Sequence, residues 1–541
     1  MADREFNLLD EPWIRVMKED CSVEEVSLTD ALIRAHEYRD LAGELPTQNA
    51  AVLRLLLAVL HAVFERVDCD GEEAAIESSD DALNRWEGLW RLGRFPEEPL
   101  RDYFSAQHEN FWLFHPTNPF WQIPAAESGT EYEASKLNGV LSESSNKLRL
   151  FPDRAGSDKS RLTYSEAARW LLYVNAFDDT SAKPTKKGKA ENDGKMPSPG
   201  AGWLGKMGFV CVFGENLFET LMLNYVLLDD HEEPWGSCVP VWELKKKRAQ
   251  ERTLIPVPDD QAALLTLQSR RLILHRENDA VTGFYLLGGD FFEKENAFSE
   301  QMTIWGPVKD KKGEITGYQP RRHDRSRQMW RDFALFASVE HSSKIPGVIR
   351  WNALLHNDGI LSEGSILRFG IASVQYGDKD FFAADVFSDE LKVHRNLLSS
   401  VGEVYRSLIV GEIGFCDKIA NAVGALSSDL FLAAGGDVEK RSTPYGTAKE
   451  KYYYEIDVPF RRWLTTLDAE DREEEREEKI KAWRKEAKDA AFRLAEKMAA
   501  DAGPAAFMGK TVRTDKNKPG KYYSSSLAMQ WFGIRMKGIW G

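Results

Sequence analysis

The stretch DREEEREEKIKAWRKEAKDAAFRLAEKMA, residues 471–499, decides how the C-terminal part of this chain folds. Its apolar side chains recur at spacings of three and four, which is the period of one face of an α-helix. This apolar stripe consists of Ile480, Trp483, Ala487, Ala490, Leu494 and Met498. Charged residues occupy most of the other positions, so the pattern predicts a long amphipathic helix with one buried face.

Similar helical patterns lie on both sides of this stretch, near residues 394–409, 454–467 and 525–540. Four amphipathic helices that are joined by short connections favour a four-helix bundle. The sequence becomes mainly helical after about residue 388, so we expect a C-terminal domain that comprises residues 389–541.

The preceding part of the chain, residues 1–388, has a mixed pattern. Short β-like runs alternate with helical stretches over residues 211–377, without the regular βαβ rhythm of a doubly wound sheet. Leu53–Phe64 has helical spacing, and Thr163 with Glu166 has the spacing of a capping box that begins a helix. We therefore expect an α+β fold, with a large mixed N-terminal domain and a C-terminal four-helix bundle.

The composition is that of a soluble globular protein, with 541 residues of which 43% are hydrophobic and 29% are charged. No apolar run approaches the roughly 20 residues that a membrane span needs, and Pro12 interrupts an acidic N-terminus that does not resemble a signal peptide. We expect a cytoplasmic protein without a membrane partner. The five cysteines are scattered and include no C-x-x-C pair, which argues against disulfides and against a structural zinc site.

The formal net charge of −15 limits how the chain can bind nucleic acid. A protein that contacts phosphates over its whole surface is normally basic, because phosphate contacts dominate affinity. Any contact must therefore come from local basic loops or from partner subunits, and binding by the isolated chain should be weak and sensitive to salt.

The glycine cluster at residues 200–207, GAGWLGKM, matches G-x-G-x-x-G and nearly matches a P-loop. Both nucleotide motifs need a hydrophobic strand before the loop, but the prolines of the preceding GKMPSP prevent one. Met207 also stands where a P-loop requires a hydroxyl. Glycines let a backbone approach a phosphate or a base edge closely, although a plain flexible turn explains such a cluster as well.

The dipeptide His323-Asp324 raises the hypothesis of a metal-dependent phosphohydrolase or nuclease. Such sites need further His and Asp ligands, and the nearest candidates, His356 and Asp358, show no recognisable pattern. A basic patch that pairs with a nucleic-acid backbone or with an acidic neighbour is the simpler interpretation. Its arginines are Arg321, Arg322, Arg325, Arg327 and Arg331. We find no motif that carries catalysis, and expect no enzymatic activity, no cofactor and no metal.

Several segments, in order along the chain, resemble the CasA family, the large subunit of the type I-E CRISPR Cascade complex. They are NLLDEPWIRV (7–16), GELPTQN (43–49), FHPTNPFWQ (114–122), AARWLLYVNAF (167–177), LTLQSRRL (265–272) and FRRWL (460–464). The resemblance implies a non-catalytic subunit that reads the short flanking motif (PAM) in duplex DNA, helps to open the strands and receives a recruited helicase-nuclease. Its partners would be the guide RNA, the other Cascade subunits and double-stranded target DNA.

The resemblance also places candidate site residues. The family's glycine loop, which enters the minor groove, falls on Gly200, Gly202, Gly205 and Lys206. The wedge at a β-hairpin tip falls on Tyr376, Gly377, Asp378 and Lys379, where many relatives carry glutamine. A loop that contacts the guide RNA or the adjacent subunit falls near residues 149–160, with Arg149, Phe151 and Arg154.

A lysine finger of the family falls near residues 284–294, where Gly288 and Gly289 would form the tip and Lys294 is the nearest lysine. The cysteine-rich zinc loop of some relatives has no counterpart in this sequence. Two rival functions stay open at this stage: a purely structural assembly subunit that never touches DNA, and a nuclease that uses His323 and Asp324.

Overall fold

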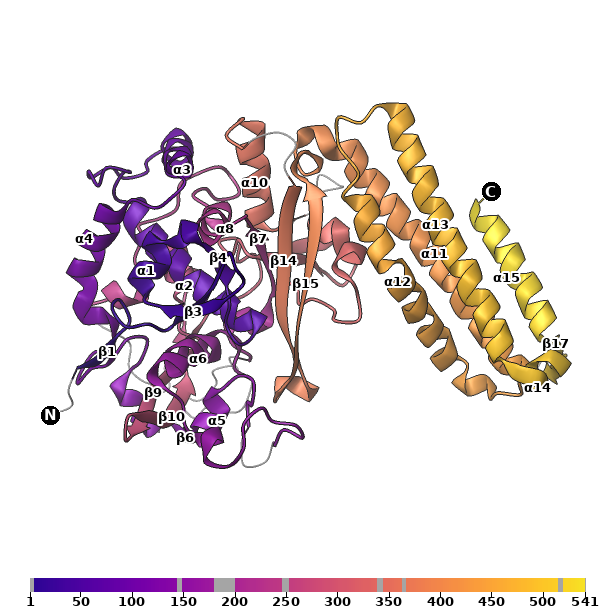
Figure 1. Ribbon diagram of the computed structural model, residues 1–541, viewed down its shortest axis with the longest axis horizontal. Coiled ribbons are helices and arrows are strands. Elements are labelled where there is room, and N and C mark those ends of the chain that lie inside the picture. The colour runs from indigo at the N-terminus through magenta and orange to yellow at the C-terminus, as the bar shows by residue number, and fades with distance from the viewer. Residues whose placement is uncertain are drawn as a thin grey trace. The chain divides into compact units, whose positions relative to one another are not determined.

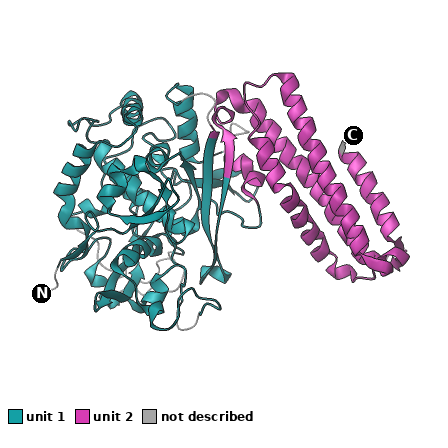
Figure 2. Ribbon diagram, in the orientation of Figure 1, with its two compact units in different colours: residues 1–327, 342–361, 367–390 teal, residues 328–341, 362–366, 391–541 magenta. Residues whose placement is uncertain are grey.

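The computed structural model describes most of the chain in detail (Figure 1). The described residues are 4–143, 148–179, 200–245, 253–337, 344–361, 366–513 and 519–540. The chain forms two compact units (Figure 2). Unit 1 comprises residues 1–327, 342–361 and 367–390, and unit 2 comprises residues 328–341, 362–366 and 391–541. Helices and strands are both well represented, and the α+β class is confirmed.

The main sheet has five strands in the order β13-β12-β7-β14-β15. Their bounds are Gly208–Phe213 (β7), Thr303–Lys309 (β12), Ile315–Pro320 (β13), Ile366–Tyr376 (β14) and Ala383–His394 (β15). Strand β7 is central and largely buried, and it pairs antiparallel with both β12 and β14. Strands β14 and β15 form a long hairpin (Figure 1).

Smaller sheets complete the strands of unit 1. One has the order β3-β2-β4, another has the order β6-β10-β9, and β1 pairs with β5 and β8 with β11. The bounds are Glu5–Asn7 (β1), Ile14–Lys18 (β2), Val23–Val26 (β3), Tyr38–Leu41 (β4), Trp112–Phe114 (β5), Thr130–Glu133 (β6), Thr253–Leu254 (β8), Arg270–Glu277 (β9), Ala280–Gly288 (β10) and Asp290–Phe291 (β11).

Helix α2 (Pro46–Phe64) lies in the core of unit 1, against α4, α6, α8 and α9. Among the described residues it is the one helix whose length and composition would suit a membrane span, but 94% of its most apolar window is buried inside the protein. Arg54 and His61 interrupt its apolar run, and burial identifies α2 as a core helix. Its buried Arg54 is neutralised by Glu300, at 2.8 Å.

Helix α6 (Tyr164–Phe177) positions several residues of the candidate site. The predicted capping box is confirmed, because Thr163 accepts from the Glu166 N–H and the Glu166 side chain accepts from the Thr163 N–H. The remaining α-helices of unit 1 are Leu28–Ile33 (α1), Ser79–Leu92 (α3), Glu97–Gln107 (α4), Ala134–Leu137 (α5), Trp203–Lys206 (α7), Leu217–Asn224 (α8), Gln261–Leu265 (α9) and Gly347–Asn357 (α10).

Unit 2 is mainly helical, and its long helix α11 contacts α12, α13 and α15. The bounds are Glu403–Ala433 (α11), Ser442–Leu464 (α12), Glu473–Asp501 (α13), Gly503–Met508 (α14), Lys510–Val512 (β16), Lys521–Tyr523 (β17) and Ser525–Trp540 (α15). Most of the predicted stripe of α13 is buried, and Trp483 stacks on Trp463 with ring centres 5.6 Å apart. The expected domain boundary at residue 388 stays a prediction.

The helix predicted at residues 394–409 is wrong in its first half. Residues 395–397 and 400–402 form short 3-10 turns, and α11 begins at Glu403. Arg406 donates to the Leu397 and Ser399 carbonyls at 2.9 and 2.5 Å. These bonds stabilise the turns, and the repeating apolar pattern does not reveal them.

Candidate nucleic-acid interface

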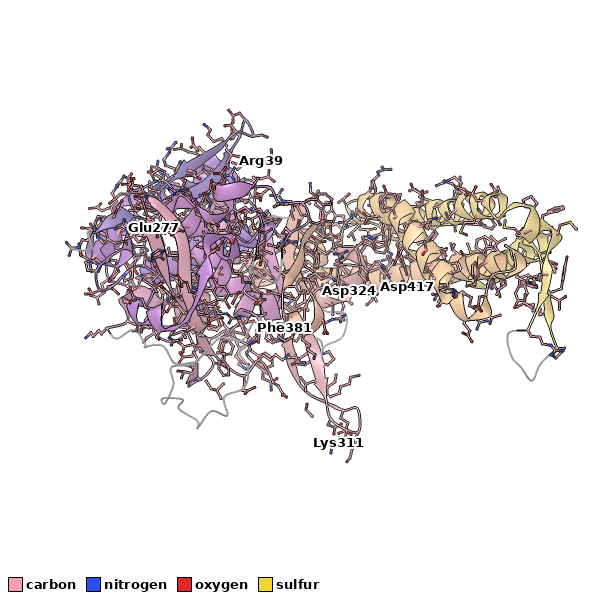
Figure 3. All side chains as sticks on the ribbon, turned by 90° about the horizontal axis from the view of Figure 1, so that it is seen from below. Arg39, Glu277, Lys311, Asp324, Phe381 and Asp417 are labelled. Atoms are coloured by element: carbon pink, nitrogen blue, oxygen red, sulfur yellow. The ribbon has the colours of Figure 1, made fainter. Side chains whose placement is uncertain are left out.

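The tip of the β14–β15 hairpin, residues 377–382, presents charged and aromatic side chains to solvent. Asp378 and Lys379 are exposed, and Phe381 and Phe382 keep 47% and 41% of their surface accessible. Figure 3 labels Phe381 at this tip. The wedge predicted from sequence, residues 376–379, includes the first residues of this tip but not the two phenylalanines. Their signal was two adjacent aromatic residues directly after a turn rich in aspartate.

The backbone of the tip is strained. Lys379 and Asp380 have φ angles of 51° and 58°, in the left-handed region that costs a non-glycine residue about 1–2 kcal/mol. The turn is closed by the Gly377 N–H, which donates to the Phe382 carbonyl at 2.9 Å. The surrounding contacts must therefore maintain this conformation.

Tyr376, the last residue of β14, connects the hairpin to the glycine segment, which we define as residues 200–206. Its hydroxyl donates to the Phe177 carbonyl, at the end of α6, at 2.6 Å. A Cβ atom at Gly205 would lie only 2.1 Å from that hydroxyl oxygen, so no other residue fits there without a rearrangement. Two segments that the sequence analysis assigned separately to DNA are in contact.

Arg322, which follows β13, bridges the same two segments. Its Nε donates to the Gly205 carbonyl at 2.6 Å, and Nη1 and Nη2 donate to the two carboxylate oxygens of Asp380 at 2.8 and 2.7 Å. The guanidinium carbon lies 4.9 Å from the ring centre of Tyr376. One arginine of the predicted basic patch therefore has an acidic neighbour within the chain.

Close packing and backbone conformation explain why glycines occupy positions in this segment. Gly202 is buried, its N–H donates to the Asp178 carbonyl at 2.9 Å, and a Cβ there would lie 2.4 Å from the Ala176 carbonyl oxygen. Gly200 has a φ of 69°, which favours glycine. A backbone loop that projects into a groove at Gly202 or Gly205 does not agree with this burial, whereas Gly200 is partly exposed.

Lys206 ends the short helix α7, with its side chain against Gly200. Burial, followed by the charges of Arg270, Lys294 and Arg322, lowers the pKa of Lys206 to about 8. An anion bound at this point would relieve the repulsion among these cations.

Arg149 connects the predicted RNA-contacting loop to the hairpin. Its Nη1 and Nη2 donate to the Ala384 and Ala383 carbonyls at 3.2 and 3.4 Å, just after the hairpin tip. Its Nε donates to the Leu141 carbonyl at 3.0 Å. Segments from three distant parts of the sequence thus meet around β14 and β15.

The loop around Arg149 exposes apolar side chains. Phe151 is 90% exposed, and Leu148 and Leu150 are 76% and 85% exposed. Arg154, by contrast, pairs with Glu166 at 2.5 Å and is partly buried. Of the three residues predicted to contact RNA or a neighbouring subunit, Phe151 is therefore the most exposed to solvent.

Gly288 and Gly289 do not form the predicted tip of the lysine finger, but Lys294 is exposed, and the placement of the finger near residues 284–294 stays a prediction. Gly288 belongs to the buried end of β10 and pairs with Arg270 of β9. A Cβ at Gly289 would lie 2.1 Å from the Gln268 carbonyl oxygen, so this position packs internally and forms no tip.

An exposed cationic tip instead lies on the β12–β13 hairpin, where Figure 3 shows Lys311 projecting from the sheet. Lys309, Lys311 and Lys312 are all exposed. Asp310 shapes the turn, since its carboxylate accepts from the Lys312 N–H at 2.8 Å, and Gly313 has a φ of 87°. The sequence signal that we missed was KDKKG between two β-like runs.

His323 and Asp324 do not form a metal site with other residues that the structure describes. The His323 Nε2 lies 3.0 Å from the Phe209 carbonyl, and burial lowers the pKa of the imidazole to about 4. Asp324 accepts from the N–H and the hydroxyl of Ser326 at 2.9 and 2.7 Å. Among the residues that the structure describes, no group of three or more His, Cys, Asp or Glu is placed to hold a metal ion.

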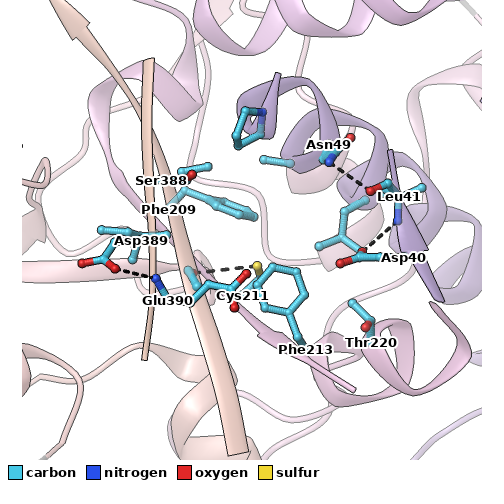
Figure 4. Close-up of a pocket in the computed structure, with 16 residues that line it drawn as sticks. Asp40, Leu41, Asn49, Phe209, Cys211, Phe213, Thr220, Ser388, Asp389 and Glu390 are labelled. Carbon is cyan, nitrogen blue, oxygen red and sulfur yellow. Dashed lines mark hydrogen bonds between the residues drawn. The ribbon is translucent and has the colours of Figure 1, made fainter. Parts of the chain in front are cut away.

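A cavity of about 190 Å³ lies in unit 1 between α2, β4 and the β7–β14 pair (Figure 4). Phe209 and Phe213 form part of its apolar wall, and Asp40, Asp389 and Glu390 add carboxylates. Burial raises the pKa of Asp40 to about 6. Carboxylates repel phosphate, so this cavity does not suit a nucleic acid.

Comparisons with known proteins point to one family. The sequence model of the family described as CRISPR-associated protein Cse1 matches residues 7–494. The crystal structure of Thermobifida fusca Cse1 is 28% identical, with a TM-score of 0.79, and the match covers 99% of this chain and 98% of that one.

Two further matches are more distant or less complete. CasA/Cse1 of Thermus thermophilus is 30% identical over 355 residues, which cover 63% of this chain and 64% of the relative's length. A chain of a structure described as a CRISPR RNA-guided surveillance complex has a TM-score of 0.65 at 16% identity, and each chain is fully covered. This last match shows the fold alone.

Proposed function

The chain belongs to the CRISPR-associated protein Cse1 family, and from this premise we propose that it is a non-catalytic subunit of an RNA-guided surveillance complex. In this role it reads the PAM in duplex DNA, begins strand opening and receives the helicase-nuclease. The guide RNA, not this subunit, reads the target sequence by base pairing.

The convergence of the three predicted segments around the β14–β15 hairpin is the observation that carries this proposal. Tyr376 and Arg322 link the hairpin to the glycine segment, and Arg149 links it to the loop that presents Phe151. A recognition subunit must couple duplex binding to the position of the guide, and these contacts offer a direct connection.

The charge distribution supports local contact with duplex DNA on a chain that is acidic overall. We assign Lys206 and the β12–β13 tip, with Lys311 and Lys312, to backbone phosphates or the minor groove. Exposed cations on a narrow hairpin suit a DNA groove, because a narrow tip fits between the two phosphate backbones. We assign the family's lysine finger to this tip in preference to residues 284–294.

We assign strand opening to the aromatic tip of the β14–β15 hairpin. Apolar side chains that insert between base steps unstack them and kink the duplex. Phe381 and Phe382 are exposed and aromatic, and Lys379 beside them can reach a phosphate. An aromatic wedge would replace the glutamine that many relatives carry.

The test is PAM-dependent binding by the reconstituted complex, with and without this subunit, measured on duplexes with a library of flanking motifs at fixed salt. We expect discrimination between motifs only when the subunit is present. Equal binding in both cases would leave a purely structural assembly role, and the site assignments would fall with it.

A further inference from the structure

The guanidinium of Arg322 is held in a fixed orientation. Its Nε is bound to the Gly205 carbonyl at 2.6 Å, and its face lies against Tyr376. The two terminal nitrogens are therefore directed at one place, which the Asp380 carboxylate occupies at 2.8 and 2.7 Å. Because the geometry is set by the backbone and by an aromatic ring, binding an anion there costs little side-chain entropy.

A forked guanidinium binds phosphate in the same two-point manner as carboxylate. The side chains of Arg322 and Asp380 are 35% and 29% exposed, so solvent and a partner molecule can reach the pair. Ion pairs with this degree of exposure contribute little net stability, which makes the exchange of one anion for another feasible.

The ion pair between Arg322 and Asp380 also affects the backbone of the hairpin tip. Asp380 and the preceding Lys379 are consecutive non-glycine residues with positive φ, and the pair with Arg322 helps to hold them so. If Asp380 leaves the guanidinium, the tip that carries Phe381 can relax into other conformations.

We propose that Asp380 occupies, in the DNA-free protein, the place of a DNA backbone phosphate on Arg322. Arrival of the duplex exchanges the carboxylate for a phosphate, and the exchange releases the hairpin tip for strand opening. Arg322 is then a DNA-binding residue, and Asp380 is an internal competitor that lowers affinity for duplexes that are not held by other contacts. This inference rests on the proposed function and assigns a regulatory element to the same site.

The chain provides a matched control for the test. Arg325 pairs with Asp385 at 2.7 Å, on the same two segments, with side-chain exposures of 50% and 56%. Asp380→Asn and Asp385→Asn therefore make the same change in net charge at neighbouring places. Asparagine tolerates the left-handed region well, so Asp380→Asn removes the charge of the pair without adding backbone strain at this position.

The measurement is the affinity of the reconstituted complex for target duplexes with and without the PAM. We expect Asp380→Asn to increase affinity for the duplex without the PAM about tenfold, and thus to reduce discrimination, whereas Asp385→Asn increases it less than about threefold. An equal increase in both variants would mean that net charge alone acts, and would overturn the inference. Weaker binding by Asp380→Asn would also overturn it.

A salt series tests the role of Arg322 separately. Each phosphate contact contributes about 0.9 to the slope of log affinity against log salt. We expect Arg322→Gln to reduce the magnitude of this slope by about one contact, and an unchanged slope would contradict a phosphate contact.

The wild-type complex in the same series separates the two proposals. If the wild type does not discriminate the PAM, the proposed function fails whatever the variants do. If it does discriminate and the two aspartate variants behave alike, only the exchange at Arg322 fails.

Discussion

The glycine segment and the β14–β15 hairpin tip lie in contact but are built in opposite ways. In the glycine segment, Gly202 and Gly205 are buried, and the Ala176 carbonyl and the Tyr376 hydroxyl leave no room for a side chain. The tip, in contrast, exposes charged and aromatic side chains on a strained backbone. The glycine spacing thus reports internal packing, and the groups able to contact DNA are the side chains around it.

The largest expected effect is on stability, and it tests the packing explanation of the glycines. Gly202→Asp would place a Cβ 2.4 Å from a carbonyl oxygen and bury a carboxylate. We expect a loss of about 4 kcal/mol or more in the free energy of unfolding, as large losses arise from such overpacking and unpaired burial. Denaturant unfolding of the purified chain measures it.

Gly200→Ala is the matched control for that variant. Gly200 has a φ of 69° and only the flexible Lys206 side chain nearby, so alanine should cost about 1–2 kcal/mol. Full stability of Gly202→Asp, with loss of PAM recognition alone, would contradict the packing explanation and favour a loop that enters the groove.

The second-largest effect is expected on strand opening, from a substitution at the exposed hairpin tip. Phe381→Ala should leave the unfolding free energy within about 0.5 kcal/mol, because the side chain is 47% exposed. It should slow strand opening by about 10- to 100-fold, since stacking a base on an aromatic ring is worth about 1–3 kcal/mol. The fluorescence of a base analogue next to the PAM would follow opening in the assembled complex.

The control for Phe381→Ala is Phe151→Ala, which makes the same truncation in a different exposed loop and is measured at a subunit concentration that saturates assembly. Opening at the wild-type rate in Phe381→Ala, or equal slowing in both variants, would count against a wedge at the tip.

A smaller effect is expected at Phe151 itself. Truncating an exposed aromatic anchor at an interface costs about 1–2 kcal/mol, so Phe151→Ala should weaken incorporation of this subunit into the complex about 5- to 30-fold. Titration of the subunit into the remaining assembly measures this. Arg154→Ala should have less effect, because Arg154 pairs with Glu166 inside the chain, and the reverse ranking would refute this assignment.

Local sequence patterns were sufficient to predict several elements of the fold. The apolar period of residues 471–499 predicted α13, and the side chains of Thr163 and Glu166 predicted where α6 begins. The start of α11 was not predictable, because Arg406 stabilises the preceding turns through contacts with carbonyls that no periodicity marks.

The sequence indicated which segments of the candidate site to consider, but not the contacts that join them. Resemblance placed the glycine segment and the hairpin tip, yet the contact of Gly205 with Tyr376 joins residues far apart in sequence. A tip was predicted at Gly288 and Gly289 because a pair of glycines is typical of a turn, whereas Gly289 is a position of close backbone packing. Exposure, which a single sequence does not report, separates these two uses of glycine.

The smallest expected effect is a pH dependence in the glycine segment. Because the pKa of Lys206 is lowered to about 8, the folded chain binds fewer protons than the unfolded chain between about pH 8 and pH 10.5. The free energy of unfolding should therefore rise with pH in this window through the Lys206 contribution. A bound phosphate raises that pKa, so duplex binding takes up a proton and affinity should fall as the pH rises through 8.

We expect a two- to fivefold fall in duplex affinity between about pH 7 and pH 9 at fixed salt. Lys206→Arg should remove this dependence because a guanidinium stays charged throughout, while Lys206→Met should bind weakly at every pH. If Lys206→Met retained the wild-type pH profile, another group would be responsible, and the glycine segment would contribute only packing. In that case the contrast with the hairpin tip would be complete, and the phosphate contacts of this region would have to come from Arg322 and the two hairpins.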